Sequence, residues 1–79
     1  MAPTLSLSYD RASDSLLIAI CPPYPEQETE ELGDGLLARF NPNTNDIEAI
    51  EIFGFSKRLQ TDRPLQLPLW ADLRLAIAP

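Results

Sequence analysis

The fold is decided by residues 29–56, TEELGDGLLARFNPNTNDIEAIEIFGFS, which carry most of the apolar side chains able to form a core. The pattern predicts two β-strands in this stretch, Leu36–Phe40 and Ile47–Phe53. Between them lies Asn41–Asp46, whose Asn, Pro, Thr and Asp residues are typical of a turn. A hairpin is therefore expected at the centre of the chain.

A second hairpin is predicted nearer the N-terminus. Residues Thr4–Tyr9 alternate between polar and apolar side chains, which indicates a half-buried strand. Ser15–Ile20 follows as its partner, with Leu16 and Ile18 on one face. The linking residues Asp10–Asp14 are turn formers, and so short a link favours antiparallel pairing.

Apolar side chains are expected on both faces of this sheet. Ile50 and Ile52 belong to the main core set. The apolar residues expected on the opposite face are Leu17, Leu37, Ile47, Ala49 and Phe53. A sheet of this kind is covered twice, or its second face meets another subunit. The protein is therefore predicted to be a homodimer.

The stretch between the two hairpins is rich in proline and then in acid. Cys21–Pro25 contains three prolines, which end the preceding strand because they remove backbone donors. Glu26–Glu31 contains four carboxylates, which are typical of a solvated loop or a charged sheet edge. The alternative is a contact surface for a cation or a basic peptide. Gly33–Gly35 then predicts a bend before the next strand.

The C-terminal part predicts a helix after an irregular connection, residues 54–66. Pro68 suits a first helical position, and apolar residues recur at three- and four-residue spacing over Leu69–Ala78. The helix, residues 68–78, is expected to pack on a face of the sheet through Trp70, with a binding platform as the alternative role of that tryptophan. Alternation of Leu73 and Leu75 leaves a strand open as a second interpretation.

Composition limits the other classes of protein. A chain of 79 residues forms one domain, residues 1–79, with the sheet over residues 4–53. One cysteine and no histidine exclude an internal disulfide and argue against a zinc site. The net charge of −6 disfavours nucleic acid and favours a basic protein partner. No membrane span, secretion signal or cofactor is indicated, and a cytoplasmic location is expected.

Several of these residues together resemble a small bacterial family catalogued as a domain of unknown function, number 2283. The resemblance is carried by Tyr9-Asp10, Asp14-x-Leu16-x-Ile18, Glu30-Glu31-Leu32-x-x-Gly35, Phe40-Asn41, Ile47-x-x-Ile50-Glu51-Ile52 and Ser56. It implies a small β-rich fold, hairpin after hairpin, with a trailing helix. It implies no established activity, but some such proteins look like partners of small toxin-like proteins, which suggests an antitoxin-like role.

The reactive side chains form no pattern that requires catalysis. The carboxylates considered as acids or bases are Asp10, Asp14, Glu28, Glu30, Glu31, Asp34 and Glu51. Turn positions explain Asp10, Asp14 and Asp34, while a cross-strand pair with Arg39 explains Glu51. Cys21 has no histidine to activate it, so a plain thiol is expected there. No enzyme activity is therefore predicted.

The predicted fold class is α+β: a small antiparallel sheet of about four strands, a hairpin plus a hairpin meander, with one C-terminal helix. The predicted function is a non-catalytic protein–protein interaction module. Its expected interaction surface comprises Glu28, Glu30, Glu31, Leu17, Leu37, Phe53 and Trp70. The alternative is a small-ligand-binding protein or enzyme with a carboxylate pocket. That pocket would be lined by at least two of Asp10, Asp14, Glu30 and Asp34.

Overall fold

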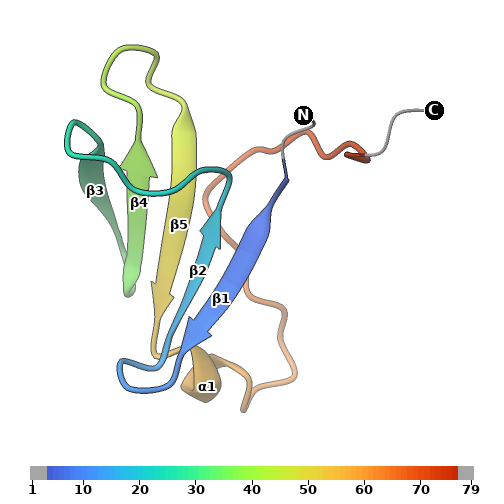
Figure 1. Cartoon of the computed structure of the whole chain (residues 1–79). Helices are drawn as coiled ribbons and strands as arrows, with labels where there is room; N and C mark the ends of the chain where they lie inside the picture. The colour runs from blue at the N-terminus through green and yellow to red at the C-terminus, as the bar shows by residue number, and fades with distance from the viewer. Residues whose placement is uncertain (1–3, 77–79) are drawn as a thin grey trace.

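The computed structural model describes residues 4–76 and contains one antiparallel sheet of five strands, followed by one short helix (Figure 1). The strands are β1 (Ser6–Asp10), β2 (Ser15–Ala19), β3 (Glu28–Gly33), β4 (Leu36–Phe40) and β5 (Ile47–Phe53). The helix, α1 (Phe55–Arg58), begins two residues after β5. The spatial order β1-β2-β5-β4-β3 places β5 at the centre, where the first hairpin meets the β3-β4-β5 meander.

The strand count differs from the prediction because Glu28–Gly33 is a fifth strand, β3. This strand pairs with β4 and forms one edge of the sheet, opposite β1 (Figure 1). Its glutamates point into solvent, so the sequence lacks the apolar alternation by which half-buried strands are recognised. The acidic stretch is therefore a charged sheet edge.

The hydrophobic core lies on one side of the sheet, which we call the core face. Its buried residues are Leu36, Ala38, Ile50 and Ile52, and Leu16 and Ile18 pack beside them from β2. Register explains this grouping, because directly paired residues project to the same side of a sheet. Leu16 and Leu36 both pair with Ile52, and Ile50 likewise pairs with a residue on each side, so the two halves of the sheet share two core residues on β5.

A bulge at the start of β5 corrects one predicted side-chain direction. Arg39 pairs with Ala49, but the next residue, Phe40, pairs with Ile47, so β5 holds one extra residue there. Ile47 consequently projects to the core face with Ile50, and not to the opposite side with Ala49 as expected. We call that opposite side the outer face.

The predicted C-terminal helix, residues 68–78, is wrong for the part that the structure describes. Residues 59–76 contain neither helix nor strand, and Ile77–Pro79 lie outside the described residues. The segment instead returns along the core face (Figure 1), and Leu67 packs against the core there. A helix of about ten residues depends on packing of its apolar face. Trp70, expected to supply that packing, is 89% exposed.

No helix within residues 4–76 is long and apolar enough to cross a membrane.

Candidate functional site

Three residues of the family-like pattern, Tyr9, Asp14 and Ser56, meet at the turn between β1 and β2. Asp14 has a left-handed φ of 52°, and its carboxylate contacts Ser56 at the start of α1. The Tyr9 hydroxyl donates to Asp14 Oδ1 at 2.5 Å, and the Ser56 amide donates to the same oxygen at 3.0 Å. The Ser56 hydroxyl donates to Asp14 Oδ2 at 2.8 Å. Three donors from two distant parts of the chain thus share one carboxylate.

This cluster is a structural clamp and is poorly suited to acid–base chemistry. The hydrogen bond from Tyr9 is the main cause that lowers the pKa of Asp14, and the same bond raises the pKa of Tyr9. A general acid at neutral pH needs the opposite shift in a carboxyl group. The Phe55 amide also donates to Asp14 O at 3.0 Å, and the Tyr9 and Phe55 rings lie 6.1 Å apart. The clamp therefore fixes α1 to the first hairpin.

A second polar cluster holds the proline-rich loop against β5. The Tyr24 hydroxyl and the Gln27 side-chain amide both donate to Glu48 Oε1, at 2.5 and 3.1 Å. The bond to Glu48 raises the pKa of Tyr24 to about 12, while the bond from Tyr24 is the main cause that lowers the pKa of Glu48. Neither member of this pair was singled out from the sequence, where Tyr24 is the one aromatic residue among the loop prolines.

The carboxylate pocket of the alternative hypothesis gains no support. Asp10, Glu30 and Asp34 are exposed, and the pKa of Asp14 is lowered where a catalytic acid would need it raised. Burial raises the pKa of the Cys21 thiol, which is the reverse of activation to a thiolate. Within the described residues, no group of three or more His, Cys, Asp or Glu side chains is placed to hold a metal ion.

The expected interaction residues fall on both faces of the sheet. Glu31, Leu37 and Leu17 lie in one row across the outer face, because Glu31 pairs with Leu37, and both leucines pair with Glu51. Phe53 lies two residues further along β5 on the same face. The predicted partner of Glu51 is confirmed, with 3.0 Å between Arg39 Nη2 and Glu51 Oε1.

The remaining three expected residues lie on the other side. Glu28 pairs with Phe40 and Glu30 with Ala38, so both belong to the core face at the β3 edge. Trp70 also lies over the core face, where the returning segment crosses the sheet. The predicted surface is therefore two separate surfaces, of which the core-face one contains a groove.

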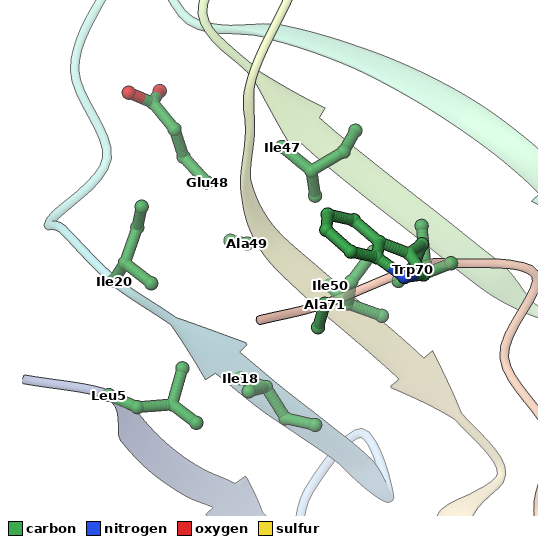
Figure 2. Close-up of a pocket in the computed structure, with 10 residues that line it drawn as sticks. Leu5, Ile18, Ile20, Ile47, Glu48, Ala49, Ile50, Trp70 and Ala71 are labelled. Atoms are coloured by element: carbon green, nitrogen blue, oxygen red, sulfur yellow. The ribbon is translucent and has the colours of Figure 1, made fainter. Parts of the chain in front are cut away.

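The groove has a volume of about 190 Å³ and lies between the sheet and the returning segment. Its lining residues include Leu5, Ile18, Ile20, Ile47, Ile50 and Trp70. Figure 2 shows these apolar side chains around the opening, with the Glu48 carboxylate directed away from the Trp70 ring. The sequence did not predict this groove, because it joins Leu5, which precedes β1, with residues of β2, β5 and the C-terminal segment.

A family model described as "Protein of unknown function (DUF2283)" matches residues 7–56. The chain belongs to this family. In this DUF2283 protein the matched region contains the clamp, the start of α1 and all five strands, apart from Ser6 at the beginning of β1. The groove is only partly inside it, because Leu5 and Trp70 lie outside the matched residues. Neither the curated proteins nor the solved structures contain a match.

Proposed function

We propose that this DUF2283 protein is a non-catalytic protein-binding module, whose core-face groove takes an apolar segment of a basic partner protein. The observation that carries the proposal is the exposure of large apolar side chains around one groove. Ile47 is 40% exposed, Leu5 is 52% exposed and Trp70 is 89% exposed. Tryptophan is among the residue types that are enriched where side chains dominate binding energy.

Charge next to the groove supports a basic partner. Glu28 lies in the same cross-strand row as Ile47, and Glu30 lies in the same row as Ile50. Adjacent strands are about 4.8 Å apart, which puts the β3 edge about 10 Å from the groove residues of β5. A bound segment with lysine or arginine beside its apolar residues would therefore meet carboxylates. The net charge of −6 would steer such a partner toward the module.

The contacts of the titratable groups support a role without catalysis. Asp14, Glu48 and Tyr24, whose pKa values are displaced, are bonded within the fold and connect separate segments of it. Such bonds explain the displaced values without a reaction. The lone Cys21 supports a reducing cytoplasmic compartment. An antitoxin-like role would be one specific form of this function, and remains a prediction from the family resemblance.

The test is affinity capture from a lysate of the source organism, followed by mass spectrometry and direct titration of the captured protein. The wild-type chain is compared with Trp70→Ala, which removes the exposed aromatic side of the groove. Glu30→Gln is compared with Glu31→Gln, because these neighbours remove the same charge from opposite faces of one strand. Far-UV circular dichroism confirms that each variant is folded.

We expect a basic protein that binds the wild type and Glu31→Gln, and binds Trp70→Ala and Glu30→Gln more weakly. Affinity should also fall as salt rises, because exposed charges are screened. The proposal is contradicted if no protein binds, or if Trp70→Ala binds the captured protein as tightly as the wild type.

A further inference from the structure

The two edges of the sheet differ in the features that prevent strand addition. The β3 edge carries three glutamates and a register shift, both of which discourage pairing with another strand. The β1 edge, SLSYD, has no proline, no register shift against β2 and one charge, at Asp10. All five of its residues are exposed. β1 is therefore an unprotected edge strand (Figure 1).

We propose that β1 pairs antiparallel with β1 of a second copy, with the two-fold axis at Ser8, so that the two sheets become one continuous sheet. Ser8 is the middle residue of Ser6–Asp10, so this register pairs the whole strand with its copy. It places Ser6 opposite Asp10 of the second copy and Leu7 opposite Tyr9 of the second copy. No two like charges face each other in this arrangement.

Other pairings of the same edges are less favourable. Pairing of β3 with another β3 brings glutamates opposite or beside one another in each register centred within Thr29–Glu31. Pairing of β1 with β3 of another copy is head-to-tail. Each such pair keeps one free β1 edge and one free β3 edge, so further copies add without closing the assembly. The β1–β1 pairing closes as a two-fold dimer and leaves the acidic edges outside.

Side-chain exposure also favours this edge. Leu7, which is 63% exposed, lies on the core face of β1, because it pairs with Ile18 and no strand lies on the other side of β1. In the dimer, Leu7 of each copy packs beside Tyr9 of the other, which removes apolar surface from water. The pairing uses the sheet edge and not the groove, so it does not rest on the proposed function.

The first test is sedimentation velocity of the full chain over a concentration series. Leu7→Glu removes the apolar contact and places two carboxylates diagonally across the axis, about 7–8 Å apart. Leu59→Glu is the matched control, because Leu59 is 67% exposed and lies outside β1. The wild type and Leu59→Glu should be dimeric, and Leu7→Glu should raise the dimer dissociation constant at least about tenfold.

The second test is disulfide formation in a Cys21→Ser background, and it holds even if Leu7→Glu disturbs folding. Ser8→Cys should oxidise to a covalent dimer, since residues paired at the axis have Cα atoms about 4.5–5.5 Å apart. Ser6→Cys should not, because the two copies of that residue lie about 13 Å apart along the strands. A monomeric wild type, or equal oxidation of the two cysteine variants, overturns the proposal.

Discussion

Replacement of Ile52 by alanine is expected to remove a large part of the stability of this protein. Ile52 is 1% exposed and pairs with Leu16 on one side and Leu36 on the other, so it joins the two halves of the core. Truncation of a buried isoleucine to alanine costs about 2–5 kcal/mol, because it combines lost burial with a cavity. A chain of 79 residues has about 4–12 kcal/mol in total.

The assay is urea unfolding followed by far-UV circular dichroism. Fluorescence is a poor probe here, because Trp70 is largely exposed in the folded state. Ile52→Val should cost about 0.5–1.5 kcal/mol. Ile47→Ala is the matched control on the same strand and face, and its 40% exposure should limit the loss to about 1 kcal/mol. Equal losses for Ile52→Ala and Ile47→Ala would refute the assignment of Ile52 as a core residue shared by the two halves of the sheet.

Four further predictions concern polar contacts and a turn. A double-mutant cycle of Arg39→Met and Glu51→Gln should give a coupling of about 0.2–1 kcal/mol by urea unfolding, because the pair is cross-strand and half-buried. Stability should fall as pH drops below 4.5, because hydrogen bonds in the folded state lower the pKa of Glu48. Stability should also fall as pH rises from 10.0 to about 12, because the folded state raises the pKa of Tyr24 and holds its proton more tightly. Tyr24→Phe should remove this part of the loss at alkaline pH. Gly35→Ala should cost about 1–2 kcal/mol, since φ is +74° there.

Each of these predictions has a distinct contradicting result. A cycle with no coupling would mean that the Arg39–Glu51 ion pair contributes nothing measurable to stability. The Tyr24 assignment fails if wild type and Tyr24→Phe lose stability equally between pH 10 and 12. If Glu48→Gln loses as much stability below pH 4.5 as the wild type does, the role assigned to that carboxylate is contradicted. Gly35→Ala with wild-type stability would contradict a left-handed turn between β3 and β4.

The strands that carry regular apolar patterns were predictable from the sequence. The predicted bounds of β4 and β5 agree with the structure, as does the pairing of β1 with β2. The contact between Arg39 and Glu51 followed from the alternation of side chains along β5. These features depend on period-two patterning and on turn residues, which are local properties of the chain.

The remaining features depend on contacts that local pattern does not encode. β3 was missed as a strand because an edge exposed to solvent needs no apolar alternation. The bulge that turns Ile47 to the core face changes register without changing the sequence pattern. Three- and four-residue spacing in a short segment resembled a helix, although Leu67 and not Trp70 packs against the core. The groove joins segments far apart in the chain.

The most direct test of the protein-binding function is photo-crosslinking in the source organism, with benzoylphenylalanine at position 70. This aromatic replaces Trp70 beside the groove, and the same probe at Leu59 is the control at an exposed apolar position after α1. The groove proposal predicts a discrete covalent adduct with another protein from position 70 and none from position 59. Adducts that are absent, equal at both positions, or formed only with the chain itself would contradict it.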